Sequence, residues 1–134
     1  MSVSFDIKSS SKTYQVAIQE DLLTKNLFEA SSDLYIIDAH VLDLYPMLHA
    51  KNLIPIPALE TSKTLDTVSY VIEQLRSKGA HRKSHLIAIG GGIIQDIATL
   101  VASLFMRGIS WSYYPTTLLG MADSCIGGKS SINV

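Results

Sequence analysis

The sequence predicts an α/β fold, a Rossmann-like and mostly parallel sheet with flanking helices and an N-terminal β-hairpin. Short, continuously apolar runs at residues 34–37 and 86–89 are typical of strands that are covered on both faces. A helical pattern over residues 64–78, between these strands, predicts one helix. A long apolar run over residues 93–106, after the second strand, predicts another. Alternation of apolar and polar residues at 3–8 and 14–18 indicates a hairpin with one buried face.

The composition fits one folded domain. The chain has 134 residues, of which 47% are hydrophobic and 17% charged, enough for a substantial core. A net charge of −1 with no basic stripe argues against nucleic-acid binding. The single cysteine, Cys125, excludes an internal disulfide and suits a reducing, cytoplasmic location. The N-terminus lacks the basic and apolar regions of a signal peptide, so none is expected.

The first half of the chain supplies several predicted elements. Residues 21–30 suit a short helix, and the strand at 34–37 ends at Asp38. A helix is expected within residues 41–50, limited to one side of Pro46. Residues 53–57 are extended, and their two prolines indicate an edge strand.

The clearest helix lies at residues 64–78. Thr64 is placed to cap its N-terminus, and Gly79 stands where a left-handed C-terminal cap is wanted. Apolar residues at spacings of three and four predict its core-facing stripe: Leu65, Val68, Ile72 and Leu75.

The glycine triplet Gly90, Gly91 and Gly92 directly follows the apolar strand at 86–89 and precedes the next helix. This arrangement brings backbone N–H groups and a helix N-terminus against a phosphate. The spacing differs from the usual G-x-G-x-x-G pattern, so a tight turn without a ligand is the alternative. The glycines, together with Asp96, also argue against a membrane span through this apolar region.

A strand is expected at residues 110–114, closed by Pro115, with a turn or short helix at 116–121. Asp38, the glycine triplet and residues 115–117 each directly follow a predicted strand. Ligands of open α/β sheets bind at the carboxyl ends of the strands, so these residues are expected at one edge of the sheet.

Several spaced blocks resemble the 3-dehydroquinate synthase family of sugar phosphate cyclases. The blocks stand in the order and at the spacing of the family: residues 90–96, 106–108, 115–119, 123–129 and 132–133. Glu60, Lys63 and Asp38 match further family positions upstream. Gln95 departs from the small residue usual there, and Val134 from a common histidine, which leaves the substrate open among related cyclases.

The resemblance implies NAD as cofactor and assigns roles by position. It implies that Asp38, Glu60 and Lys63 contact the adenosine ribose and that the backbone of Gly91, Gly92 and Ile93 contacts the pyrophosphate. It implies that Asp96 supports the cofactor. Contacts toward the nicotinamide half are implied for Thr116, Thr117, Leu119, Asp123 and Ser124. For catalysis it implies that Asp123 and Lys129 face the substrate, and that Arg107 reaches the substrate phosphate across the subunit boundary of a homodimer.

The implied reaction converts DAHP, a seven-carbon sugar acid phosphate, into 3-dehydroquinate with loss of phosphate. Members of the family run well beyond twice this length and hold zinc or cobalt in a helical C-terminal domain. The chain is therefore expected to be an N-terminal NAD-binding domain, residues 1–134, inactive alone and without metal ligands of its own. A cyclase of natural-product or polysaccharide biosynthesis, a metal-dependent alcohol or glycerol dehydrogenase, and a non-enzymatic nucleotide-binding module remain alternatives.

Single residues also have plainer interpretations. Asp38 could be a helix cap, Asp96 a partner of the helix dipole, and Arg107 a charge at a helix end. Thr116 and Thr117 could form a turn, Lys129 could be solvated surface, and Cys125 a small buried residue. His81 and His85 have a metal-like spacing, but they fall in a predicted polar loop, where that spacing has no meaning.

Overall fold

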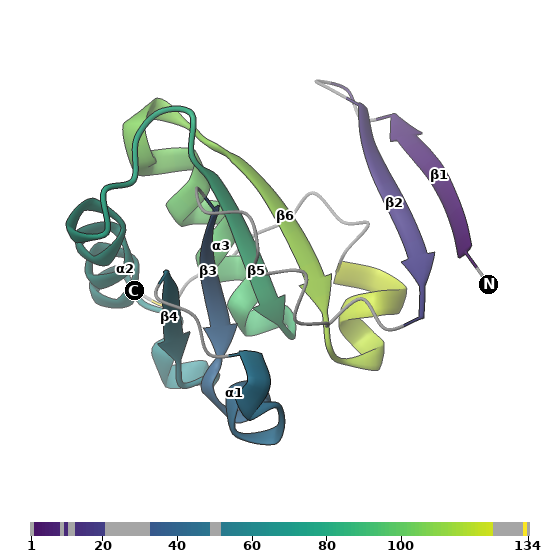
Figure 1. Ribbon diagram of the computed structural model, residues 1–134, viewed down its shortest axis with the longest axis horizontal. Helices are drawn as coiled ribbons and strands as arrows, with labels where there is room; N and C mark the ends of the chain where they lie inside the picture. The colour runs from purple at the N-terminus through teal and green to yellow at the C-terminus, as the bar shows by residue number, and fades with distance from the viewer. Residues whose placement is uncertain are drawn as a thin grey trace.

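Four parallel strands form the sheet on which the rest of the chain is organised (Figure 1). The computed structural model describes residues 2–8, 10, 13–20, 33–48, 52–124 and 133. The sheet has the order β4-β3-β5-β6. Its strands are β3 (Asp33–Asp38), β4 (Leu53–Ile56), β5 (His85–Gly90) and β6 (Ser110–Pro115). The edge position predicted for the proline-containing strand β4 is confirmed.

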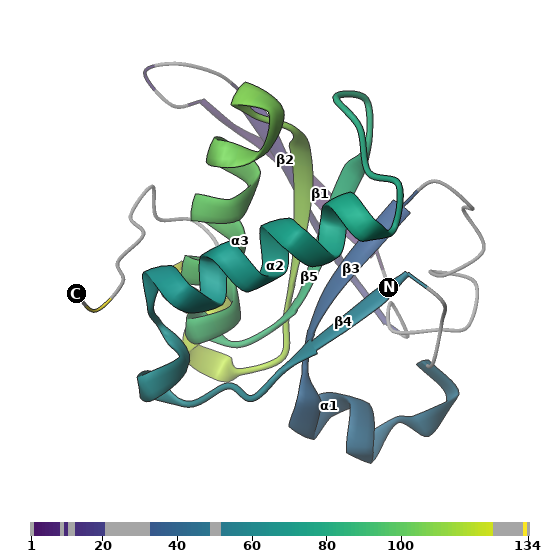
Figure 2. The ribbon, with the colours of Figure 1, turned by 90° about the vertical axis from the view of Figure 1, so that its left-hand side faces the viewer.

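Helices cover the two faces of this sheet unequally. On one face, α2 (Leu65–Ser77) and α3 (Gly92–Leu104) pack side by side, as Figure 2 shows. On the other face lie α1 (Ala39–Leu44) and a short 3-10 turn, Pro46–Leu48. Helix α1 ends before Pro46, as expected. Further short turns are Glu60–Ser62, Phe105–Arg107 and a π-helical turn, Gly120–Ser124.

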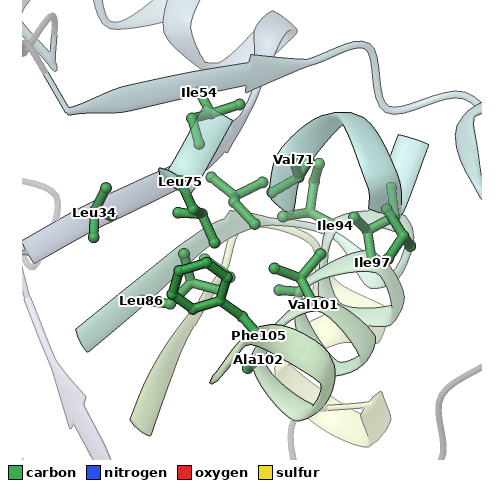
Figure 3. Close-up of a cluster of buried hydrophobic side chains, with 14 of the residues drawn as sticks. Leu34, Ile54, Val71, Leu75, Leu86, Ile94, Ile97, Val101, Ala102 and Phe105 are labelled. Atoms are coloured by element: carbon green, nitrogen blue, oxygen red, sulfur yellow. The ribbon is translucent and has the colours of Figure 1, made fainter. Parts of the chain in front are cut away.

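The core is built from the continuously apolar strands. Alternate side chains of β3 point to opposite faces, so Leu34 and Ile36 pack under α2 and α3, while Tyr35 and Ile37 pack with α1. Figure 3 shows the larger cluster, where residues of α2 and α3 meet the sheet. Burial of both faces explains why these strands are apolar throughout. The predicted Rossmann-like fold is confirmed.

Helix α2 has the predicted ends. The Thr64 hydroxyl accepts a hydrogen bond from the backbone N–H of Thr67 at 3.2 Å, which caps the N-terminus. At the other end, Gly79 has a φ of +80°. The N–H of Ala80 donates to the carbonyl of Leu75 at 3.0 Å, and Gly79 to that of Arg76 at 3.0 Å, which is a Schellman motif.

The predicted apolar stripe of α2 is wrong at one position. Val68 and Leu75 are buried and Ile72 is half-buried, but Leu65 is 53% exposed. Val71, outside the predicted stripe, is fully buried instead. Helix α2 packs against both the sheet and α3, so its buried face is centred nearer Val71 than the regular spacing suggested.

The N-terminal hairpin pairs β1 (Ser2–Lys8) with β2 (Thr13–Gln19) in antiparallel register. In Figure 1 it stands on the β6 side of the sheet, away from α2. The hairpin is confirmed, but the buried face expected for it is not observed. Val3, Phe5 and Ile18 are more than two-fifths exposed, and no described residue of either strand is buried. Two strands alone leave both faces of a hairpin accessible to solvent.

Other predictions concern connecting segments. The helix expected at residues 21–30 lies outside the described residues. The helix expected to extend to Met106 ends at Leu104, because Met106 and Arg107 take positive φ angles of 49° and 67°. Within the described part of the chain, no helix has the length and apolar character needed to span a membrane.

Two leucines of α2 test this packing. Leu75→Ala is expected to lower the free energy of unfolding by about 2–5 kcal/mol, because it leaves a cavity under α2. Leu65→Ala, on the exposed side of the same helix, should change it by no more than about 0.5 kcal/mol. Urea unfolding followed by circular dichroism measures both, and equal losses would contradict the observed orientation of α2.

Candidate functional site

The topology of the sheet indicates that a ligand would bind at the carboxyl ends of its strands. From β3 the chain passes through α1 on one face to β4, whereas from β5 it passes through α3 on the other face to β6. Strands β3 and β5 are neighbours, so the direction of winding reverses between them. In open α/β sheets, ligands bind in the crevice at the carboxyl ends of two such strands. Here those ends are Asp38 and Gly90.

The absence of a side chain at Gly90 allows a close approach at this point. A Cβ built on Gly90 would lie 2.5 Å from Cγ1 and 2.8 Å from Cβ of Ile94, and 3.3 Å from Cβ of Asp38. Ile94 is fully buried in the first turn of α3, so it has little room to move. Glycine therefore lets α3 begin directly against the strand end beside Asp38.

The Gly90 carbonyl is held from β6. It accepts hydrogen bonds from the backbone N–H of Thr116 at 2.9 Å and from the Tyr113 hydroxyl at 3.2 Å. The first bond extends the pairing of β5 with β6 to the residue after β6, and the second comes from a side chain within β6. The turn between β5 and α3 is thereby fixed on the side of β6.

The N-terminus of α3 is open toward this edge. Gly91 is its N-cap and, having no side chain, makes no side-chain capping bond. The first N–H groups of a helix have no partner within the helix, and they carry its partial positive charge. A Cβ on Gly92 would meet no atom within 4 Å. This is the arrangement that accommodates a phosphate against a backbone, so the residues present fit the pyrophosphate of NAD.

Asp38 lies at the end of β3 with its carboxylate capping α1. The backbone N–H of His40 donates to Oδ1 of Asp38 at 2.9 Å. The plainer interpretation, a helix cap, is therefore present in the structure. A carboxylate has about four acceptor positions, so this bond leaves capacity to accept from the hydroxyls of a ribose. Both roles are compatible at this residue.

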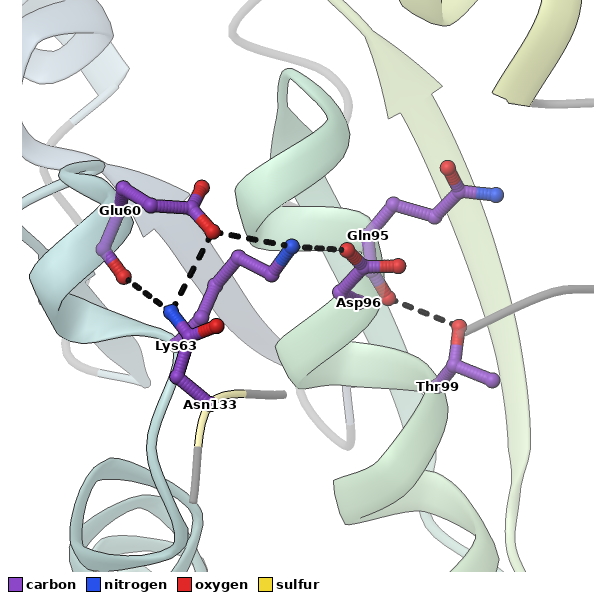
Figure 4. A network of polar contacts seen from close by, with 6 residues as sticks. All are labelled: Glu60, Lys63, Gln95, Asp96, Thr99 and Asn133. Carbon is purple, nitrogen blue, oxygen red and sulfur yellow. Dashed lines mark hydrogen bonds and ion pairs between the residues drawn. The ribbon is translucent and has the colours of Figure 1, made fainter. Parts of the chain in front are cut away.

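Glu60, Lys63 and Asp96 form an ionic network beside the glycine turn (Figure 4). Nζ of Lys63 lies 2.9 Å from Oδ2 of Asp96 and 3.6 Å from Oε1 of Glu60. The Lys63 and Asp96 side chains are only 12% and 17% exposed, whereas that of Glu60 is 67% exposed. The turn after β4 is thus joined to the second turn of α3. All three residues were expected to contact or support one ligand, but their pairing with one another was not predicted from the sequence.

The network keeps Lys63 charged. The hydrogen bond that the Lys63 ammonium donates to Asp96 is the main cause that raises the pKa of Lys63 above its usual 10.5; burial acts in the opposite direction, and the charge of Glu60 adds to the increase. Because the pKa is higher in the folded than in the unfolded chain, the stabilisation is fully present below pH 10.5. It is lost only as the pH rises through the raised value, so the pair is intact at neutral pH.

The end of β6 contributes Thr116 and Thr117. The Thr117 hydroxyl accepts from the N–H of Gly120 at 3.0 Å, so it caps the helical turn that follows. A Cβ on Gly91 would lie 2.9 Å from Cγ2 of Thr117, which places this threonine next to the glycine turn. Leu119 is 70% exposed. The predicted turn or short helix is confirmed.

Arg107 lies at the opposite edge of the sheet from the glycine turn. Helix α3 has 13 residues and is therefore about 20 Å long, and Arg107 follows its far end. The residue is exposed and has a φ of +67°, next to Met106 at +49°. Within one copy of the chain, Arg107 does not join the predicted site residues that the structure describes. Its predicted role, across a subunit boundary, stays a prediction.

The remaining predicted residues are only partly described. The backbone of Asp123 and Ser124 lies in the π-helical turn that follows β6. Lys129, Cys125 and residues 127–128 lie outside the described residues. The structure also adds Asn133, whose side chain contacts Glu60. The sequence matched Asn133 to the family pattern but gave it no role, because no local pattern reveals a contact across 73 positions.

The histidines have structural partners. His85 begins β5 rather than lying in a loop as predicted, because it pairs with Ser110 at the start of β6. Its Nδ1 and Nε2 lie 2.8 Å and 2.7 Å from the hydroxyls of Ser110 and Ser112. Nδ1 of His81 accepts from the N–H of Lys83 at 3.2 Å. In the parts of the chain described, no three His, Cys, Asp or Glu residues form a group able to hold a metal ion.

The chain is similar in sequence to 3-dehydroquinate synthases. Residues 53–134 match the family described as 3-dehydroquinate synthase, N-terminal. The 3-dehydroquinate synthase of Dictyoglomus thermophilum is 37% identical over 96% of this chain and 38% of its own length. The chain spans well under half the length of the curated relatives that it matches.

Solved structures of two other synthases share the fold of this chain. A crystal structure of 2-deoxy-scyllo-inosose synthase superposes with a TM-score of 0.85 at 25% identity, over 98% of this chain and 41% of that one. A 2-epi-5-epi-valiolone synthase from Streptomyces hygroscopicus subsp. jinggangensis, with NAD+ and Zn2+ bound, has a TM-score of 0.73 at 35% identity, over 86% and 35% of the two chains.

Alanine substitutions at two glycines of the turn are expected to have opposite effects on stability. Gly90→Ala is expected to lower the free energy of unfolding by about 1–3 kcal/mol, because the new methyl group collides with buried Ile94. Gly92→Ala should leave it unchanged or raise it by up to about 1 kcal/mol, because the methyl group enters open space at a helical position. Urea unfolding of both variants is the measurement, and a tolerated Gly90→Ala would refute the close packing described here.

Proposed function

Because this chain belongs to the 3-dehydroquinate synthase N-terminal family, we propose that it is the NAD-binding part of a sugar phosphate cyclase. The proposed site for NAD lies at the carboxyl ends of the neighbouring strands β3 and β5. The observation that supports this most strongly is the uncapped start of α3, with open space at Gly92, at the winding reversal of the sheet. The NAD+ in the related valiolone synthase is consistent with the same cofactor here.

Each group at this edge has a proposed task. The N–H groups of Gly92 and Ile93, with the backbone of Gly91, bind the pyrophosphate. Asp38 accepts hydrogen bonds from the adenosine ribose, and the paired Glu60 and Lys63 border the same half of the cofactor. The other side of the turn carries Thr116, Thr117 and Leu119, which with Asp123 and Ser124 lie toward the nicotinamide. Asp96 keeps Lys63 charged and in place.

When bound, NAD supplies reversible oxidation of a substrate alcohol, which makes the neighbouring proton acidic enough for phosphate to leave. The contribution of the protein is to orient cofactor and substrate. In this proposal Asp123 and Lys129 face the substrate, and Arg107 of one subunit binds the substrate phosphate in the site of the other. The position of Arg107, about 20 Å from the glycine turn along α3, is the reason that a homodimer is included.

The proposed reaction is the conversion of DAHP into 3-dehydroquinate, a step in aromatic amino acid biosynthesis, in the cytoplasm. It is supported by the matching family and by relatives that are named 3-dehydroquinate synthase along nearly the whole chain. The structures of similar fold include cyclases with other names. Another sugar phosphate is therefore the competing substrate.

The complete protein is proposed to have a second domain after these 134 residues. The length of the relatives supports this division, as does the Zn2+ in the valiolone synthase. That domain would hold the divalent metal, zinc or cobalt, which polarises the reacting oxygen of the substrate. Residues 1–134 alone would then bind cofactor but not turn over substrate.

Cofactor binding tests the proposed site directly. The complete protein should bind NAD in calorimetry, and Gly92→Val should weaken this binding at least about tenfold, because the side chain fills the space above the helix start. Gly92 is a cleaner position than Gly91, where a Cβ would meet Thr117. The unfolding temperature of Gly92→Val provides the control. Unchanged NAD affinity in this variant would refute the proposed pyrophosphate position.

Phosphate release identifies the chemistry. The complete protein with NAD and zinc or cobalt should release inorganic phosphate from DAHP faster than from a hexose phosphate or another heptose phosphate. Elimination of phosphate separates a cyclase from an alcohol or glycerol dehydrogenase, which only reduces the cofactor. Preference for a different sugar phosphate would change the substrate but keep the cyclase, whereas accumulation of NADH without phosphate release would overturn the cyclase assignment.

A further inference from the structure

Asn133 makes three hydrogen bonds to the turn that follows β4. Its side-chain amide Nδ2 donates to the backbone carbonyl of Glu60 at 3.0 Å and lies 3.2 Å from the Glu60 carboxylate oxygen Oε1. Its backbone N–H donates to the carbonyl of Lys63 at 2.6 Å. Asn133 also forms a parallel bridge with Thr64, the N-cap of α2. One residue thus holds both ends of the 60–63 turn.

These bonds continue into the ionic network (Figure 4). Oε1 of Glu60 is shared between the Asn133 amide and Nζ of Lys63, which in turn lies 2.9 Å from Asp96 on α3. A carboxylate held by a fixed donor has fewer orientations, so the lysine that it faces has fewer as well. The side chain of Glu60 is 67% exposed and would otherwise sample several rotamers.

We propose that Asn133 is a positioning residue for NAD: its amide fixes the Glu60 carboxylate, which keeps the Lys63 ammonium beside Asp96 in the second turn of α3. This inference rests on the proposed cofactor site and adds to it a residue that does not itself touch the cofactor.

The amide donor, rather than the mere presence of a side chain, is the important feature. The amide contacts the Glu60 carboxylate, which faces Lys63, and Lys63 pairs in turn with Asp96. Asn133→Ala removes the donor but retains the backbone bond to Lys63. Asn133→Asp places a carboxylate against the carboxylate and carbonyl of Glu60, so it should disturb the network more than alanine does.

The test is NAD affinity of the complete protein by calorimetry, with unfolding temperatures of all variants. Asn133→Ala is expected to weaken NAD binding about tenfold, because a hydrogen bond to a charged group is lost. Asn133→Asp should weaken it further. A matched control is Asn52→Ala, since the Asn52 amide also donates to a distant backbone carbonyl, that of Asp33 at 3.3 Å, but at the other edge of the sheet. This control should bind NAD like the wild type.

A double-mutant cycle separates positioning from a general structural effect. Glu60→Gln introduces an amide that can donate to the carboxylate created by Asn133→Asp, so the pair is restored with its polarity reversed. The double variant should bind NAD at least about fivefold more tightly than the sum of the binding free-energy changes of the two single variants predicts. Additive effects would overturn the proposal, as would wild-type affinity in Asn133→Ala. Failure of the wild type itself to bind NAD would instead refute the proposed function.

Discussion

The absence of a side chain at Gly90 allows α3 to begin directly against the end of β5. Helix α3 starts so close to the end of β5 that a methyl group at Gly90 would overlap Ile94 and crowd Asp38. The helix can then bury Ile94 and Ile97 against the sheet while its uncapped N-terminus opens at the point where the winding reverses. Packing and the candidate site are therefore two consequences of the same local geometry. A residue with a side chain at this position would disturb both.

Around this turn, elements distant in the sequence are held by polar contacts. Strand β6 fixes the Gly90 carbonyl through Thr116 and Tyr113. The turn after β4 reaches α3 through Lys63 and Asp96, two side chains that are mostly buried. Asn133 then ties a later part of the chain to Glu60. The proposed binding site is assembled from these segments and needs such connections, because the groups that bind a ligand have to be held in a fixed arrangement before the ligand arrives.

Local patterns in the sequence predicted much of the fold. Continuous apolar runs predicted β3 and β5, Thr64 and Gly79 predicted the ends of α2, and prolines predicted the edge strand β4. Each of these signals is a property of neighbouring residues. The exposure of Leu65 and of the hairpin could not be predicted in the same way, because burial depends on which other elements pack against a surface.

In the candidate site too, some features were predicted from local sequence and others were not. The glycine turn and Asp38 were predicted from their position after strands, and the structure brings them together. The Lys63–Asp96 pair and the Asn133–Glu60 contact join residues 33 and 73 positions apart, so no local pattern signals them. Arg107 was assigned by resemblance, and only the three-dimensional fold shows how far it lies from the turn within one chain.

NAD is proposed to bind against the start of α3. Hydrogen–deuterium exchange of the complete protein, with and without saturating NAD, measures this binding at the amides concerned, because the first amides of a helix have no partner within the helix. Exchange at residues 92–94 should become slower on addition of NAD. Unchanged exchange there, with protection confined to other parts of the chain, would contradict this proposal.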